Sequence, residues 1–272
     1  MIYKGKWALV TGASAGIGEA FAAALAEKGA NLILTARRSD RLNRLAAELQ
    51  EKFGSETLVI EADLSQPDAP EKIEAAVRAG GRQVDILVNN AGFGLPGHYE
   101  QSPWATHRDF IELMVTSYAH LVRLFLPAMQ SRKFGRIINV ASVAGLVPSA
   151  AGHTLYGATK AFLISFSEAL AAENKDTGVH VSALCPGFTY SEFHDVNNMR
   201  GVVSQLPKYM FMNAAPVASG ALHSIEARQA IYVPGLWNKF VVWLMKALPR
   251  SWAAALVARQ SHRFRSADAP TV

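Results

Sequence analysis

The chain has 272 residues, of which 50% are hydrophobic and 18% charged, and its formal net charge at pH 7 is +5. This balance is typical of a globular protein, and the length suits one large α/β domain without a linker or an internal repeat. The single cysteine, Cys185, excludes an internal disulfide, and the eight histidines lack the paired spacing of a zinc site, so we predict no metal. Residues 1–7 contain no apolar run of a secretory signal, which favours a cytoplasmic protein.

Apolar, β-branched segments alternate with helical patterns along the chain. Strands are predicted at residues 7–11, 31–36, 57–62, 84–88, 137–141, 179–184 and 230–233. Helices are predicted from the end of the first strand to about residue 28, where Gly29 caps the helix, and over residues 40–52, 71–78, 106–131 and 158–172. The strands are apolar without alternation and each is followed by a helix. This pattern predicts a single-domain, Rossmann-like, doubly wound parallel sheet of about seven strands with helices on both faces.

Glycine or polar residues follow six consecutive predicted strands. The carboxyl ends of parallel strands meet at one edge of a sheet, and ligands bind beyond that edge. The sequence therefore predicts one binding site there, formed by the glycine loop 12–18, Arg37 and Arg38, Asp63, residues 89–92, Ser142, and residues 186–189.

The glycine loop has Gly-x-x-x-Gly-x-Gly spacing, with glycines at 12, 16 and 18, between the first strand and the first helix. Such a loop lets backbone approach a pyrophosphate closely, and the helix N-terminus favours its negative charge. The loop also contains Gly12-x-Ser14-x-Gly16, the nucleophile-elbow pattern of α/β hydrolases. A serine hydrolase using Ser14 is therefore a remote alternative, disfavoured because no Asp and His pair stands out at later strand ends.

A hydroxyl, a phenol and an ammonium are expected to converge. Ser142 ends the fifth strand, and Tyr156 and Lys160 are four residues apart on one helix face. A phenol with a pKa of about 10 is a poor acid or base at neutral pH, and a nearby cation favours its charged form. Tyr-x-x-x-Lys alone is more often an ordinary exposed helix pair, but together with Ser142 and the glycine loop it predicts a site for a small polar group of a substrate.

The chain resembles the short-chain dehydrogenase/reductase family over roughly residues 4–235 in an ordered set of motifs: Thr11-Gly12-Ala13-Ser14-Ala15-Gly16-Ile17-Gly18, Asp63-Leu64, Asn89-Asn90-Ala91-Gly92, Ser142, Tyr156-x-x-x-Lys160 and Pro186-Gly187. The resemblance implies a domain that binds NAD or NADP and transfers hydride between nicotinamide and a carbonyl or alcohol. Tyr156 would be its acid or base, Lys160 would lower the pKa of that phenol and hold the nicotinamide ribose, and Ser142 would donate to the reacting oxygen.

The resemblance also implies cofactor contacts along the same edge. Asp63 would contact the adenine, Asn89 the adenosine side, and residues 187–189 the nicotinamide. For Asp63 and Asn89, a strand-end cap or turn is the alternative role. The predicted cofactor-binding set is Gly12, Ser14, Ala15, Gly16, Ile17, Gly18, Arg37, Arg38, Asp63, Leu64, Asn89, Ala91, Gly92, Tyr156, Lys160, Gly187 and Thr189.

The end of the second strand indicates which cofactor is used. It reads Ala36-Arg37-Arg38, whereas an acid about 20 positions beyond the glycine loop would hold the ribose 2′-hydroxyl of NAD. Guanidinium groups suit a 2′-phosphate, so we predict NADP(H). Asp40 is the nearest acid, and we expect it in the first turn of a helix, where a carboxylate favours the dipole.

The sequence departs from the family pattern in three places. Met114 stands where the family usually has a catalytic-site Asn, Ser142 and Tyr156 are one residue further apart than is common, and Ser191 stands where a Thr often follows the Pro-Gly turn. Methionine offers only a weak sulfur acceptor in place of the amide. A cofactor-binding scaffold or sensor with little catalysis therefore stays as the alternative to a working oxidoreductase.

Residues 1–235 form the predicted dinucleotide-binding and catalytic domain, and residues 236–272 form a basic, apolar extension of it. Residues 236–249 are the most apolar stretch but are too short and too interrupted by lysines to span a bilayer. They are interpreted either as a helix packed at an oligomer interface or over the substrate pocket, or as an amphipathic helix on an anionic membrane surface. Both interpretations favour an apolar small-molecule carbonyl or alcohol as substrate, and we expect a homo-oligomer, cytoplasmic or peripheral at a membrane.

The positive charge is concentrated near the C-terminus. Seven basic residues and no acid lie between Arg228 and Arg265, so the rest of the chain carries a small net negative charge. The main body therefore lacks the basic surface of a nucleic-acid-binding protein, and we predict no nucleic-acid partner.

Overall fold

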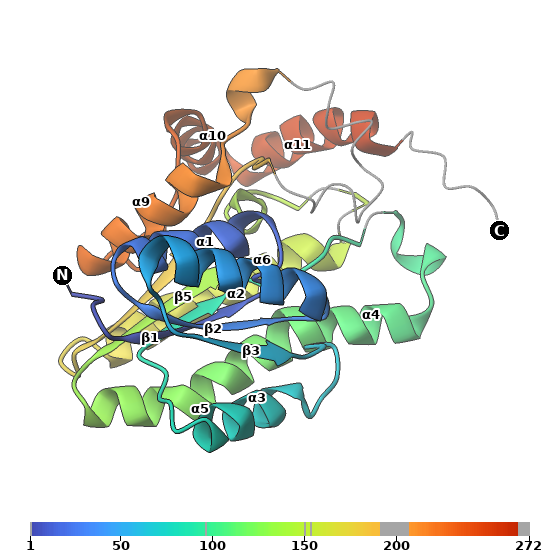
Figure 1. Cartoon of the computed structure of the whole chain (residues 1–272). Helices are drawn as coiled ribbons and strands as arrows, with labels where there is room; N and C mark the ends of the chain where they lie inside the picture. The colour runs from blue at the N-terminus through green and yellow to red at the C-terminus, as the bar shows by residue number, and fades with distance from the viewer. Residues whose placement is uncertain (1, 96, 150, 153, 191–206, 266–272) are drawn as a thin grey trace.

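The computed structural model describes residues 2–95, 97–149, 151–152, 154–190 and 207–265. Seven parallel strands form one sheet in the order β3-β2-β1-β4-β5-β6-β7 (Figure 1). This confirms the predicted doubly wound sheet, with β7 two residues long instead of the four expected. The strands are β1 (Trp7–Thr11), β2 (Asn31–Ala36), β3 (Thr57–Glu61), β4 (Ile86–Asn89), β5 (Gly135–Val140), β6 (Val179–Leu184) and β7 (Ile231–Tyr232).

Helices cover both faces of this sheet because alternate side chains of each strand face opposite ways. In β1, Ala8 and Val10 pack in the cluster that includes α1, α2 and α9, whereas Leu9 packs in the cluster that includes α3 to α6. Gly29, with φ of +83°, follows α1 as predicted. The helices are α1 (Gly16–Glu27), α2 (Ser39–Phe53), α3 (Ala69–Ala79), α4 (Trp104–Ile111), α5 (Ser117–Ser131), α6 (Thr154–Glu173), α9 (Ala214–Glu226), α10 (Leu236–Ala247) and α11 (Arg250–Arg265). Neither α9 nor α11 had been predicted as a helix from the sequence.

The long helix predicted over residues 106–131 begins earlier, at Trp104, and is interrupted by a π-helical turn over Glu112–Thr116. A π turn keeps the helix going while inserting one residue, so the apolar pattern of the sequence does not reveal it. By length and composition alone the run 104–131 could cross a membrane. Its apolar side chains instead pack against the sheet, as those of a core helix do.

The strand order reverses direction between β1 and β4. The loops that leave these two strands therefore diverge to opposite faces and open a crevice at the carboxyl edge of the sheet. The hydroxyl of Thr11, the last residue of β1, holds the two sides together by accepting from the backbone amides of Asn90 (2.8 Å) and Ala91 (3.0 Å). The fold thus positions the glycine loop and the loop after β4 as the two sides of one crevice.

Candidate active site

A cavity of about 1020 Å³ lies over the carboxyl edge of the sheet. The loops after strands β1 to β6 contribute to its wall, as the sequence predicts for a doubly wound sheet. Of the predicted site residues, all but two line it: Gly12, Ser14, Ala15, Gly16, Ile17, Arg37, Arg38, Asp63, Leu64, Ala91, Gly92, Ser142, Tyr156, Lys160, Gly187 and Thr189.

The glycine loop turns β1 sharply into α1. Gly12 and Gly16 have φ values of +64° and +61°, which residues other than glycine rarely adopt. Ala15, at the N-cap of α1, offers no side-chain cap, so the first amides of the helix lie uncapped at the cavity wall. Gly18 is a correction to the predicted set. It does not line the cavity but lets α1 pack against Gly12 and Asn90, where a Cβ would overlap both.

Two exposed arginines stand at the rim, directly after β2. The Nη2 of Arg38 donates to the Oγ of Ser14 at 3.0 Å. Asp40, the nearest acid, lies in the first turn of α2, as predicted. The contact also weighs against Ser14 as a hydrolase nucleophile, because a guanidinium stays charged and cannot accept its proton. No histidine lines the cavity within the described part of the chain.

Asp63 has the turn role that was the alternative for it, and its predicted contact with the adenine stays a prediction. One carboxylate oxygen accepts from the backbone amide (3.0 Å) and hydroxyl (2.8 Å) of Ser65, forming a turn after β3, and the residue also lines the cavity.

Asn89 is the second correction, because its side chain is fully buried and does not reach the cavity. As the last residue of β4 it points into the packed interior, where its Nδ2 donates to the Oδ1 of Asn139 at 2.9 Å. Asn90, the next residue, takes the cavity position, and its Nδ2 donates to the carbonyl oxygen of Thr11 at 2.9 Å. The sequence motif contains both asparagines, and only the register of β4 decides which one faces the crevice.

Ser142, Tyr156 and Lys160 converge in the cavity. The hydroxyls of Ser142 and Tyr156 are hydrogen-bonded, so the loop between them absorbs the extra residue of spacing. The Nζ of Lys160 lies 5.7 Å from the centre of the Tyr156 ring and donates to the carbonyl oxygen of Val140 at 2.7 Å. Lys160 is only 5% exposed. Ser191, the third departure from the family pattern, lies outside the described residues.

Burial is the largest influence on the pKa values of Tyr156 and Lys160. Burial raises the pKa of the Tyr156 phenol above its ordinary value, and the hydrogen bond with Ser142 acts in the opposite direction. Burial lowers the pKa of Lys160 from 10.5 to about 7. In the protein alone, Lys160 is therefore largely neutral at the pH where the phenol would titrate. The expected lowering of the Tyr156 pKa by Lys160 stays a prediction for the state in which Lys160 is charged.

Met114 is fully buried within the π-helical turn and supports the cavity wall. A Cβ added to Gly92 would come within 2.9 Å of the Met114 Sδ, so the thioether packs directly behind this glycine. One helical turn later, the buried hydroxyl of Tyr118 donates to the carbonyl oxygen of Ala91 at 2.7 Å. Burial raises the pKa of Tyr118, and a negative charge on Tyr156 raises it further. The sequence analysis did not single out Tyr118. Its one signal in the sequence is its position four residues after Met114, on the same face of the predicted helix.

The C-terminal helices complete the cavity. Residues of α10, together with Val257 of α11, line its apolar side. The side chain of Asn238 seats α10 against Gly187, where a Cβ would overlap it, and its Nδ2 donates to the carbonyl oxygen of Pro234 at 2.8 Å. The sequence indicated an apolar stretch here without deciding what it covers. The lining residues of α10 are Trp237, Asn238, Phe240, Val241, Leu244 and Met245.

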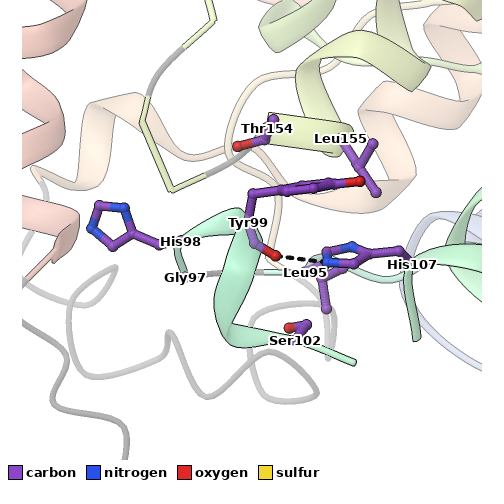
Figure 2. Close-up of a pocket in the computed structure, with 8 residues that line it drawn as sticks. All are labelled: Leu95, Gly97, His98, Tyr99, Ser102, His107, Thr154 and Leu155. Carbon is purple, nitrogen blue, oxygen red and sulfur yellow. Dashed lines mark hydrogen bonds between the residues drawn. The ribbon is translucent and has the colours of Figure 1, made fainter. Parts of the chain in front are cut away.

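A second cavity, of about 10 Å³, is only large enough for one water molecule (Figure 2). His107, 5% exposed, lies beside it and its Nε2 is 2.8 Å from the carbonyl oxygen of Tyr99. The two rings stack with centroids 4.5 Å apart. Thr154 and Leu155, just before Tyr156, form the opposite wall. The walls of this small cavity therefore bring the loop after β4 next to the start of α6.

A family model described as short chain dehydrogenase matches residues 6–200. The chain belongs to the short-chain dehydrogenase family. This short-chain dehydrogenase is 32% identical over 276 aligned positions to a very-long-chain 3-oxoacyl-CoA reductase of Anas platyrhynchos, covering 96% of this chain and 82% of that protein. The match confirms the family expected from the ordered motifs and makes the chain an oxidoreductase by family.

Two solved structures show the same fold over nearly the whole chain. One, from a study of 7β-hydroxysteroid dehydrogenase stereoselectivity, has a TM-score of 0.84 at 28% identity and covers 94% of this chain and 98% of that one. The other, a short-chain dehydrogenase from Sphingobium yanoikuyae in complex with NADPH, has a TM-score of 0.78 at 31% identity and covers 97% and 98% of the two chains.

Proposed function

We propose that this short-chain dehydrogenase uses NADP(H) to interconvert a carbonyl and an alcohol on an apolar small molecule. The observation that carries the proposal is that the side chains of Ser142, Tyr156 and Lys160 meet in the same cavity as the glycine loop. A cavity of about 1020 Å³ is large enough to hold a dinucleotide and a substrate together.

The residues present fit NADP(H). The uncapped start of α1 and the positive-φ glycines suit a pyrophosphate, because amide groups and the helix dipole favour negative charge there. Arg37 and Arg38 stand exposed at the end of β2, where a ribose 2′-phosphate would find two guanidinium groups. The NADPH complex of the Sphingobium relative supports the same choice.

The cavity residues divide the chemistry between them. The bound cofactor supplies the hydride. In the reduction, Tyr156 gives its phenolic proton to the carbonyl oxygen, and Ser142 donates a hydrogen bond to that oxygen as negative charge develops on it. Lys160, when protonated, favours the phenolate that Tyr156 becomes. In the oxidation, the same phenolate takes the hydroxyl proton back.

The substrate end of the cavity favours an apolar molecule. Its walls there are side chains of α10 and α11, with Leu244, Met245 and Val257 among them. Relatives are named for very-long-chain 3-oxoacyl-CoA and for hydroxysteroids, and the long acyl chain and the steroid rings are large apolar groups, which supports the same class. We would follow NADPH oxidation with a panel of long-chain and polycyclic ketones, with small polar ketones as controls. Turnover of the polar ketones alone would contradict the proposed class, and no turnover at all would favour a scaffold or sensor.

Met114 is the observation that keeps the scaffold alternative open. Because a π-helical turn leaves backbone carbonyls without their usual helical partners, water can be held at this point without a side-chain amide. We therefore expect Met114→Asn to change the maximal rate by less than about tenfold, equivalent to about 1.4 kcal/mol of barrier. A gain of a hundredfold or more, measured by steady-state NADPH oxidation, would show that the native proton supply is broken.

The low pKa of Lys160 predicts how stability depends on pH. The pKa of this lysine is 10.5 in the unfolded chain and about 7 in the folded protein. Between these values the unfolded state binds more protons, so the destabilisation that Lys160 causes is full below pH 7 and is lost as pH rises towards 10.5. Lys160→Met should therefore raise the free energy of unfolding above that of the wild type by more at pH 7 than at pH 9. The difference between the two proteins should shrink by up to about 1.4 kcal/mol for each pH unit.

Urea unfolding of both cofactor-free proteins at the two pH values measures this difference. The change in packing caused by the substitution does not depend on pH, so it cancels when the two pH values are compared. The bond from Lys160 to the Val140 carbonyl strengthens when the ammonium is charged, and this effect is already part of the Lys160 pKa. A stability gap that stays constant between pH 7 and pH 9 would contradict the low pKa.

A further inference from the structure

The outer face of α10 leaves large apolar side chains in water. Leu236 is 85% exposed, Phe240 49% and Trp243 64%. These positions are spaced i, i+4 and i+7, so they lie on one side of the helix. The opposite side carries Val242, which is buried, and Val241 and Met245, which line the cavity. Phe240, like Trp237, also borders the cavity, so the exposed stripe adjoins the cavity lining, whereas Leu236 and Trp243 lie outside that lining.

Aromatic rings extend this stripe. Trp237 and Phe240 have ring centres 5.9 Å apart, and Phe240 and Trp243 have ring centres 6.1 Å apart. Tyr209, which is 65% exposed, stands edge-on to Trp237 at 5.2 Å. A continuous row of exposed aromatic side chains is far larger than the scattered apolar residues of an ordinary surface and marks a contact surface.

The next helix has the same character. Trp252 is 66% exposed and Leu256 45%, and with the exposed Arg259 they are spaced i, i+4 and i+7 on one side of α11. Ala253, 1% exposed, lies outside this stripe. The helices α10 and α11 contact each other and lie together at the top of Figure 1, on the opposite side of the molecule from α3 and α5.

The charge around these apolar side chains is of one sign. Lys239, Lys246 and Arg250 are exposed, and no acid occurs anywhere between Arg228 and Arg265. A second copy of the chain docked symmetrically through this surface would bring like charges together. A surface of opposite charge with an apolar interior suits both features, because tryptophan prefers the interface of a bilayer and lysine is attracted to anionic headgroups.

We propose that the outer faces of α10 and α11 dock the protein on an anionic lipid bilayer. The docked helices lie in the plane of the interface, with their aromatic side chains among the headgroups and their lysines against negative charge. Their inner faces line the cavity, so a molecule dissolved in the bilayer meets the substrate end of the cavity across the thickness of one helix layer. This delivery rests on the proposed function, whereas the docking itself does not.

Sedimentation of the full-length protein with vesicles tests the docking. Vesicles of phosphatidylcholine alone are compared with vesicles containing one part phosphatidylglycerol to three parts phosphatidylcholine. We expect at least about tenfold stronger binding to the anionic vesicles, weakened by added salt. Trp243→Ala with Trp252→Ala, and separately Lys239→Glu with Lys246→Glu, should each weaken that binding by about tenfold or more. None of these four residues lines the cavity, so NADPH binding should be unchanged.

Matched controls are available on other surfaces of the molecule. Trp104 of α4 has the same 64% exposure as Trp243, and Lys4 and Arg44 are exposed basic residues outside the two helices. Trp104→Ala and Lys4→Glu with Arg44→Glu should leave vesicle binding unchanged. Equal binding to neutral and anionic vesicles would overturn the proposal. So would a tryptophan pair variant that dissociates an oligomer in light scattering while keeping its vesicle binding, because the surface would then join two copies of the chain.

Discussion

Replacing Tyr156 by phenylalanine should lower the rate of carbonyl reduction by about 10²- to 10⁴-fold, the usual contribution of a positioned proton donor. The ring would stay packed in α6, and only the hydroxyl that is hydrogen-bonded to Ser142 would be lost. NADPH affinity should change by no more than a few-fold, because the glycine loop and the rim arginines supply most of the cofactor contacts that we propose. Steady-state NADPH oxidation and fluorescence titration with NADPH measure the two quantities separately.

Tyr118→Phe is the matched control for this variant. Tyr118 is the other buried tyrosine hydroxyl at the site, but its bond goes to the Ala91 carbonyl. Losing one neutral hydrogen bond should cost about tenfold in rate or less. If Tyr156→Phe kept near-normal rates on a substrate that the wild type reduces, the proton would come from elsewhere, and the assignment of Tyr156 would be wrong.

Changing Arg37 and Arg38 together to aspartate should weaken NADPH binding by about a hundredfold or more, because two charge-assisted contacts to phosphate are replaced by two repelling charges. NADH lacks the 2′-phosphate, so its dissociation constant should change by only a few-fold. The change does not alter the glycine loop, although it removes the bond from Arg38 to the Ser14 hydroxyl. Titration of both nucleotides against both proteins gives the four dissociation constants.

Arg44→Asp separates the local effect from a general change of charge. Arg44 is exposed on α2 and does not line the cavity, so this variant should bind NADPH almost as the wild type does. A wild-type protein that bound NADH as tightly as NADPH would contradict the proposed cofactor preference directly, whatever the variants do.

The sequence by itself determined the sheet, the edge where the site lies and most of the residues in its wall. Unbroken apolar strands followed by helices admit a doubly wound sheet, and in such a sheet the strand ends meet, so Arg37, Asp63 and Ser142 could be placed together without coordinates. The spacing of Tyr156 and Lys160 likewise required only a helix. These predictions depended on local periodicity and on one rule of topology, both of which a single sequence carries.

Only the tertiary structure decided the positions that depend on register and packing. The end of β4 decides that Asn90, and not Asn89, faces the crevice, and the contact of α1 with the loop after β4 makes Gly18 a packing glycine. The lowered pKa of Lys160 comes from burial by segments distant in sequence, because desolvation is set by everything that surrounds the ammonium. The C-terminal helices could be recognised as apolar from their composition, but which side lines the cavity and which side faces water depends on how they pack, and packing depends on residues throughout the chain.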